Sequence, residues 1–278
     1  MRIAYGAVPV LCLSMVAVVV PRVASFPGAA GGAAAAGPDG RWVAEQIRDR
    51  DQGRDARFDV RMRIVDSRGG VRERRFALML KRGAKGEDRG LIRFTQPADI
   101  KSTGLLVWKH EKAESERFLF LPAMGRVRRI AGGEAQESFV GSDFSYEDVS
   151  GQDIDSYTYE LLDAEGATTD SAGATYKSYK LQARALDTSA PFPTTVSYVD
   201  KESFIVRRAE RLDRAGQRRK TYDVQKVEKV GGFWTALSAT MATDRERTRT
   251  ELLIDKSEYN VGLTEDDFSR RALERGGP

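Results

Sequence analysis

The alternation of apolar and polar positions is the strongest pattern along the chain. Phe58, Val60, Met62 and Ile64 are separated by single charged residues, which predicts a strand with one dry face and one charged face. The turn-forming stretch 66–70 follows, and the apolar stretch 75–80 comes next. We therefore expect an antiparallel hairpin.

The same succession of short apolar stretches and turn residues continues to residue 254. It predicts a mainly β chain, folded as one antiparallel barrel or strongly curved sheet. Short helices are expected at 42–47, where Asp39 is a candidate N-cap, and after Thr264 near the C-terminal end. The longest stretch without a strand pattern is 131–156. Further strands are expected at 90–94, 104–109, 117–121, 125–130, 157–162, 176–183, 194–200, 203–212, 220–227, 233–241 and 248–254.

Residues 1–36 have the pattern of a targeting segment. Arg2 precedes an apolar run over 3–20, and a small-residue stretch ends in four alanines at 33–36. This order is typical of a secretory signal peptide. The alternative is an uncleaved membrane anchor, because about 18 apolar residues can just span a bilayer. We favour cleavage, which leaves residues 37–278 as a single domain.

Composition narrows the possible functions. The 278 residues include 45 Lys and Arg against 41 Asp and Glu, and the leader contributes two of the positive charges. This nearly equal number of positive and negative charges argues against a nucleic-acid partner. One Cys and one His, Cys12 and His110, exclude a disulfide framework and almost every zinc site. No nucleophile elbow or phosphate-binding loop is present, so we expect no enzymatic activity, no cofactor and no metal.

Large apolar residues of the first strands have two possible roles. They could pack against one another or beneath a helix, as such residues usually do. Alternatively, the sheet is too wide for its few helices to fill, and a cavity for an apolar ligand remains. The candidate cavity residues are Phe58, Val60, Met62, Phe76, Leu78, Leu80, Leu106, Trp108, Phe118 and Phe120.

Four blocks in the middle of the chain carry a family resemblance. They lie at 93–104, 118–123, 125–130 and 138–148. In this order and spacing they resemble the outer-membrane lipoprotein-sorting protein family, which is related to the LolA/LolB carriers. The resemblance extends from about Val43 to Phe268, although the chain is longer than typical LolA carriers and has its own central motif.

The resemblance implies both a fold and a role. The fold is a half-open antiparallel β-barrel with short helices as a lid, and acyl chains enter the space between sheet and lid. The implied protein is periplasmic and monomeric, binds lipid or an acylated protein as cargo, and works with an RND-type inner-membrane transporter. The second hypothesis is an accessory protein of such a transporter or envelope complex that carries no cargo.

The block at 138–148 and the two arginines before it form a candidate rim segment. In one interpretation it is loop architecture, and in the other it forms the cavity rim or a partner surface. We expect Arg128 and Arg129 to form ion pairs with Asp143, Glu147 and Asp148. A glycine at 141 allows a backbone geometry that a side chain would block. The candidate rim residues are Arg128, Arg129, Phe139, Gly141, Asp143, Phe144 and Tyr146.

Overall fold

Thirteen strands form one antiparallel sheet. The computed structural model describes residues 38–83, 87–110, 113–170 and 173–275, so the predicted signal peptide and Cys12 lie outside the described residues. The strands are β1 (Asp55–Val65), β2 (Val71–Lys81), β3 (Arg89–Gln96), β4 (Gly104–Trp108), β5 (Glu116–Leu121), β6 (Arg126–Ile130), β7 (Tyr157–Thr169), β8 (Thr175–Ala185), β9 (Thr194–Asp200), β10 (Val206–Leu212), β11 (Arg218–Val230), β12 (Phe233–Thr243) and β13 (Thr248–Tyr259).

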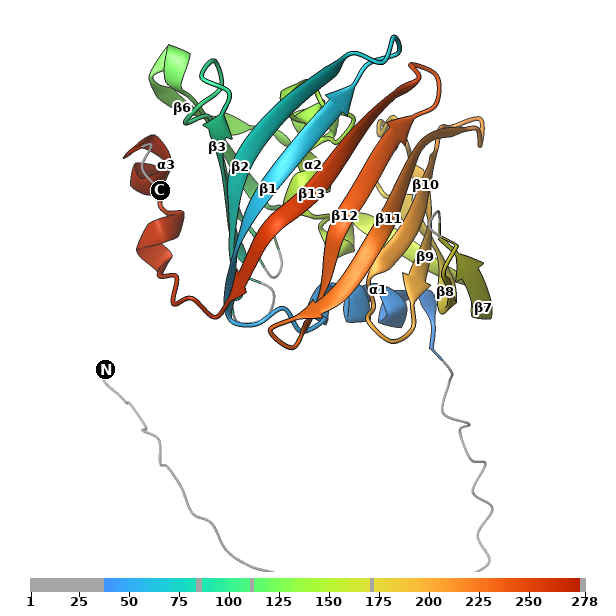
Figure 1. Ribbon diagram of the computed structural model, residues 1–278. Coiled ribbons are helices and arrows are strands. Elements are labelled where there is room, and N and C mark those ends of the chain that lie inside the picture. The colour runs from blue at the N-terminus through green and yellow to red at the C-terminus, as the bar shows by residue number, and fades with distance from the viewer. Residues whose placement is uncertain (1–37, 84–86, 111–112, 171–172, 276–278) are drawn as a thin grey trace, which may run out of the picture. The chain divides into compact units, whose positions relative to one another are not determined.

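The sheet consists of two meanders that meet in the middle (Figure 1). Strands β1 to β6 follow one another along one arm, and β7 to β13 follow one another along the other. The arms join where β1 pairs with β13, so that Phe58 faces Ser257 and Met62 faces Leu252. Strands β6 and β7 are the two edges and do not pair. The sheet is therefore a half-open barrel, as the family resemblance implied.

All the strands expected from the sequence are present, and several are longer than expected. β7 continues to Thr169 and β13 to Tyr259. One boundary differs: the stretch expected at 203–212 begins as a strand only at Val206. Phe204 has a φ of 51°, a left-handed conformation that is incompatible with a strand. The residues before Val206 therefore form the turn after β9.

The crossover segment, residues 131–156, connects the two edge strands across one face of the sheet. It contains η3 (Gly132–Gln136), η4 (Phe139–Gly141), α2 (Tyr146–Ser150) and η5 (Ile154–Ser156). Ser145 caps α2 by accepting a hydrogen bond from the Asp148 backbone N–H, and the Asp148 carboxylate accepts from Ser145 in return. This reciprocal cap lets so short a helix begin at a fixed place.

Helix α1 (Gly40–Asp49) lies on the same face as the crossover segment. Asp39 is its N-cap, accepting from the Trp42 N–H at 2.8 Å, as predicted. Val43 and Ala44 pack against residues of β8 and β9. A side chain at Gly40 would lie 2.8 Å from the backbone of Glu160, so this glycine allows the close approach of α1 to β7.

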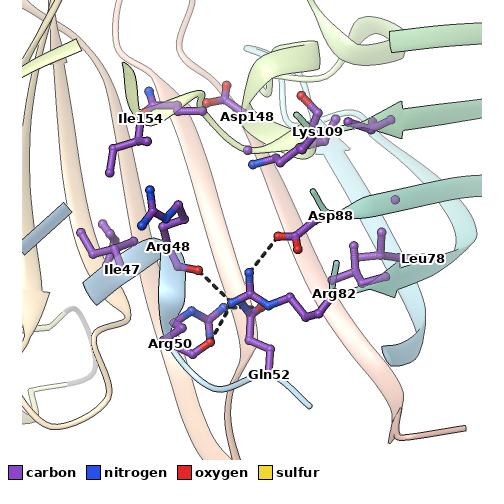
Figure 2. A pocket seen from close by; sticks show the side chains of 18 of the residues that line it. Ile47, Arg48, Arg50, Gln52, Leu78, Arg82, Asp88, Lys109, Asp148 and Ile154 are labelled. Atoms are coloured by element: carbon purple, nitrogen blue, oxygen red, sulfur yellow. Dashed lines mark hydrogen bonds and ion pairs between the residues drawn. The ribbon is translucent and has the colours of Figure 1, made fainter. Parts of the chain in front are cut away.

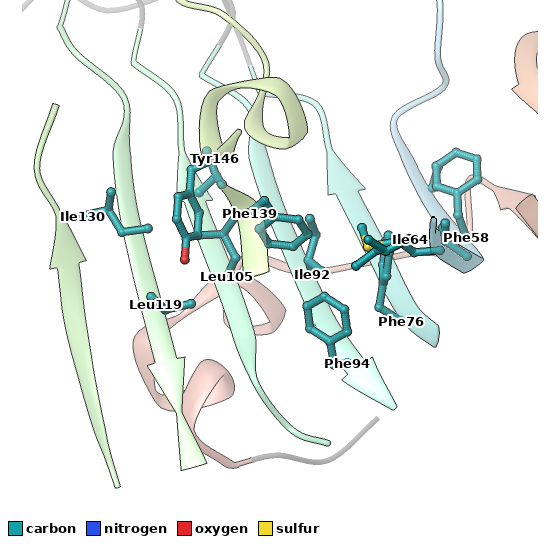
Figure 3. Close-up of a cluster of buried hydrophobic side chains, with 14 residues drawn as sticks. Phe58, Ile64, Phe76, Ile92, Phe94, Leu105, Leu119, Ile130, Phe139 and Tyr146 are labelled. Carbon is teal, nitrogen blue, oxygen red and sulfur yellow. The ribbon is translucent and has the colours of Figure 1, made fainter. Parts of the chain in front are cut away.

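The two faces of the sheet are covered by different parts of the chain. The inner face, which bears Phe58 and Met62, packs against Phe139 and Tyr146 of the crossover segment (Figure 3). The opposite, outer face of β3 to β6 packs against Phe268 and Leu273, from η6 (Glu265–Phe268) and α3 (Arg270–Arg275). Within the described ranges, no helix is long and apolar enough to cross a membrane.

Candidate functional site

A pocket of about 480 Å³ lies on the inner face, between the sheet, α1 and the crossover segment. This volume is within the range of small-molecule sites, roughly 300–1,000 Å³. Figure 2 shows part of its lining, with Ile47 from α1, Ile154 from the crossover segment and Leu78 from β2. The pocket is therefore enclosed by three parts of the chain that lie far apart in the sequence.

The pocket surface is largely apolar and includes residues from both arms of the sheet. It includes residues of β1 to β4 on one arm and of β7 to β10 and β13 on the other, so that neither arm forms the pocket alone. Its apolar lining residues are Ala44, Ile47, Ala56, Phe58, Leu78, Leu80, Ile92, Val107, Val149, Ile154, Tyr159, Leu181, Ala183, Val206 and Tyr259.

Charged residues, uncharged polar residues and two glycines line the remainder of the pocket. Arg82 forms an ion pair with Asp88 at 2.8 Å and also donates to the carbonyls of Arg48 and Arg50 (Figure 2). It thereby connects the end of β2 to the last turn of α1 and to the residue that follows this helix. Asp148 forms an ion pair with Arg211 of β10, which fixes α2 to the other arm.

Several titratable groups around the pocket are shifted by burial. Burial lowers the pKa of Lys109, and the nearby carboxylates of Asp153 and Asp88 only partly offset this effect. Burial likewise lowers the pKa of Arg50. Burial raises the pKa of Tyr159 to about 12. All three shifts disfavour charge, as expected in a space of low polarity.

Three of the ten predicted cavity residues line this pocket, namely Phe58, Leu78 and Leu80. Val60, Met62 and Phe76 lie on the same face. They are packed against other side chains beyond the pocket, and Met62 is 0% exposed. These three residues are therefore part of the packed core, which was the other role considered for them from the sequence.

The other four predicted cavity residues, Leu106, Trp108, Phe118 and Phe120, lie on the outer face, so their assignment to the inner cavity is wrong. They pack beneath η6 and α3. The Trp108 indole N–H donates to the Phe268 carbonyl at 2.8 Å, and the Arg270 guanidinium lies 4.1 Å from the centre of the Phe118 ring. In β4 and β5 the inward positions are instead Leu105, Val107 and Leu119.

The pocket residues outside the first hairpin were not predicted from the sequence. Ile92 and Val107 could have been assigned from strand parity once one residue of each strand was placed. Leu181 and Ala183 lie in a strand that was predicted at 176–183, but nothing in the sequence places it opposite β2. The pocket residues of α1 and α2 are brought to the pocket by tertiary packing, which no local sequence pattern indicates.

The candidate rim segment is bound to the sheet by buried polar contacts. The carboxylate of Asp143 accepts hydrogen bonds from the hydroxyls of Thr243, Thr248 and Thr250 at 2.6, 2.5 and 2.7 Å. Lys220 donates to the Asp143 carbonyl at 2.6 Å. These contacts attach the segment to the β12–β13 hairpin and to β11.

The aromatic residues of the same segment point into the protein. Phe139 and Tyr146 belong to the inner cluster, with ring centres 5.6 Å apart (Figure 3). Phe144 is buried with its ring edge toward Tyr222. Gly141 has a φ of 74°, a left-handed conformation. The aromatic rings therefore contribute packing rather than an exposed apolar surface.

The predicted ion pairs of Arg128 and Arg129 with the acidic residues of this segment are wrong. Arg128 pairs with Glu134 at 3.0 Å and Arg129 with Glu116 at 3.6 Å. The reason is local, because η3 follows β6 closely in the sequence and places Glu134 beside Arg128 of that strand. The acidic residues of the segment instead have the partners described above, and Glu147 accepts from Gln136 and Tyr157.

Other candidate chemical groups lie away from the pocket. His110 is half-buried, and its Nε2 is 3.2 Å from Glu116. Asp153 accepts from Ser115, and Asp155 pairs with Arg41. In the part of the chain that the structure describes, no three His, Cys, Asp or Glu side chains are grouped as metal ligands would be.

Comparisons with known proteins bear on this arrangement. The family model described as "-like: Uncharacterized protein" matches residues 86–275. No curated protein matches. Among solved structures, a DUF1329 family protein from Desulfovibrio piger is 28% identical, with a TM-score of 0.75 and coverage of 84% of this chain and 97% of its own.

Two further structures extend the comparison. An outer membrane lipoprotein-sorting protein domain from Vibrio parahaemolyticus is 26% identical, with a TM-score of 0.75 and coverage of 85% of this chain and 98% of its own. A LolA superfamily protein from Nitrosomonas europaea is 15% identical, with a TM-score of 0.65 and coverage of 84% and 99%, and shares the fold. The chain therefore belongs to the family whose model matches residues 86–275, is similar to outer-membrane lipoprotein-sorting proteins, and has a LolA/LolB-like half-open barrel.

Proposed function

We propose that this chain is a periplasmic, non-enzymatic carrier that binds lipid or an acylated molecule in the inner-face pocket. The observation that carries the proposal is the apolar pocket surface shared by both arms of the sheet. Each methylene group that leaves water for such a surface gains about 0.8 kcal/mol. An acyl chain is the common biological group that matches an apolar surface of this kind.

The test is saturable binding of a fluorescent fatty acid to the protein, compared among three variants. Leu80 is half-buried and lines the pocket, so Leu80→Arg places a charge in the pocket while the guanidinium can still reach water. We expect this variant to fold and to bind at least roughly tenfold more weakly, since charge burial is costly. Leu186→Arg is the matched control, because Leu186 is 59% exposed, and it should bind normally.

Met62→Arg is the third variant and measures packing instead of binding. Because Met62 is fully buried, an arginine there should unfold the protein whether or not the pocket binds a ligand. If the wild-type protein shows no saturable binding, the carrier proposal is lost. The accessory role beside an RND-type transporter then becomes the better hypothesis, consistent with the packed part of the inner face around Met62 and Phe139.

Location is a separate part of the proposal. The apolar leader and its alanine-rich end support export and cleavage, with residues 37–278 forming the mature domain. Fractionation of the native host followed by N-terminal sequencing should recover a shortened periplasmic protein that begins between residues 25 and 38. Recovery of the full-length chain in membranes alone would instead show an uncleaved anchor.

A further inference from the structure

The charged residues of the pocket are unequal in number and in pairing. Six cationic side chains line it, from Arg48, Arg50, Lys81, Arg82, Arg89 and Lys109, against three carboxylates, Asp55, Asp88 and Asp148. All three carboxylates are occupied. Asp88 accepts from Arg82, Asp148 from Arg211, and Asp55 from the backbone N–H groups of 261 and 262. Among the lining residues, cationic side chains thus outnumber carboxylates, and two of the cations, Arg48 and Arg89, pair instead with Asp49 and Glu265 outside the lining.

Lys109 differs from the other cations of the pocket. It follows β4 directly, and Figure 2 shows its side chain extended into the pocket between Asp88 and Asp148, with no dashed line to either. Among the described residues, no ion pair or side-chain hydrogen bond involves its ammonium group. Arg50, by contrast, donates to Gln52 and to the Trp234 carbonyl, and Lys81 donates to the Leu263 carbonyl.

The ammonium of Lys109 lies beside Gly151 of the crossover segment. The Nζ atom is 2.6 Å from the point that a Cβ at Gly151 would occupy, so a side chain there would displace the ammonium. Val107, two residues before Lys109, and Val149, two residues before Gly151, line the same pocket. Leu78 and Leu80 line it from β2. A half-buried, unpaired cation therefore adjoins an apolar surface.

We propose that the pocket selects an anionic amphiphile, with the acid group on Lys109 and the apolar chain along β1 to β4. The inference rests on the proposed carrier function and specifies its cargo. An anion at this place gives the ammonium the partner that it lacks, and a hydrogen bond between charged groups is among the stronger polar contacts. An uncharged lipid would leave the ammonium unpaired.

The test uses displacement of N-phenyl-1-naphthylamine, an uncharged fluorescent probe whose own binding does not need Lys109. The competitors are hexadecanoate, hexadecyl phosphate, methyl hexadecanoate and inorganic phosphate. For the wild type we expect both long-chain anions to compete at least roughly tenfold better than the ester, as the strength of hydrogen bonds to charged groups suggests. Inorganic phosphate should not compete.

Lys109→Met removes the charge and retains most of the length. In this variant the preference for the anions over the ester should disappear, while the affinity for the ester is unchanged. Lys256→Met is the matched control, because Lys256 is exposed and paired with Glu258 at 3.0 Å, and it should behave as the wild type. Should Lys109→Met fail to fold, Lys109→Gln replaces it, and the preference of the wild type remains decisive.

The outcomes separate this inference from the proposed function. Equal competition by the ester and the anions in the wild type would overturn the inference and leave the carrier intact. A preference that survives in Lys109→Met would also overturn it. Competition by inorganic phosphate as strong as that of hexadecyl phosphate would show a site for soluble anions. Absence of saturable binding by the probe and by every competitor would refute the carrier itself.

Discussion

At the scale of single residues, the unpaired ammonium of Lys109 should make the empty protein less stable. Burial lowers its pKa, so the charged form is disfavoured in the folded state relative to the unfolded one. Below the lowered pKa the group is charged in both states, and the folded protein carries the full penalty. As the pH rises from the lowered pKa toward the ordinary lysine value, the penalty disappears.

We therefore expect Lys109→Met to raise the melting temperature of the ligand-free protein at pH 7. Each kcal/mol relieved corresponds to roughly 2–4 °C for a chain of this size. The gain over the wild type should shrink as the pH approaches 10.5, and Lys256→Met should show no comparable gain. Thermal melts between pH 7 and 10.5 measure this, and a lower melting temperature at pH 7 would contradict the expectation.

Gly141 provides a second prediction, which concerns the backbone. Because its φ is 74°, Gly141→Val should destabilise the protein by about 1–3 kcal/mol. No atom lies within 4 Å of the Cβ position, so the cost would come from the backbone conformation and not from a clash.

Gly133→Val separates these two causes. Gly133 also has no atom within 4 Å of its Cβ position, but its φ is not in the left-handed region. Denaturant unfolding of the two variants should show a clear loss for residue 141 and little change for residue 133. Equal stabilities would mean that the segment does not depend on this conformation.

At the scale of secondary-structure elements, Asp143 is the main attachment of the crossover segment to the β12–β13 hairpin. Asp143→Ala leaves three threonine hydroxyls without their acceptor, and Thr250 is fully buried. An unsatisfied buried group costs about 1–3 kcal/mol. We expect a loss of about this size in the free energy of unfolding, with faster amide exchange across 137–150.

Asp99→Ala is the matched control for this element. Asp99 is exposed in the turn after β3, and its loss should change stability by less than about 0.5 kcal/mol. Faster exchange throughout the sheet of Asp143→Ala, instead of in the crossover segment, would show that the carboxylate supports the whole fold and not one element.

The strands were predictable because most have one exposed face and hence an alternating pattern. That signal is weak in β4 and β5, whose residues are buried on both faces because α3 covers the outer one. Leu106 and Phe118 were placed on the wrong face for this reason. The helix caps at Asp39 and Thr264 were predictable because capping is local.

Long-range polar partners could not be predicted in the same way. Asp143 is about a hundred positions from the three threonines that it binds, and nothing in the sequence relates them. Lys109 was unpredictable for another reason, because no described residue pairs with its ammonium group and a missing partner leaves no pattern in the sequence. Both depend on how the two arms and the crossover segment meet.

At the scale of the whole sheet, the pocket draws residues from both arms, so a bound ligand should stabilise them together. We expect fatty-acid binding to slow amide exchange in β2 and in β8, from which Leu80 and Leu181 reach the pocket. Hydrogen exchange with and without ligand measures this, and β6 is the internal control because it does not contribute to the pocket. Protection of one arm alone would place the ligand elsewhere.

The pairing of β1 with β13 has a consequence for how the protein is made. The first strand of the chain pairs with the last one. The ladder between the two arms therefore cannot form before residues 248–259 are present. Until Tyr259 is present, the two arms cannot line the pocket together. A chain truncated before β13 should therefore lack the complete pocket and bind no ligand there.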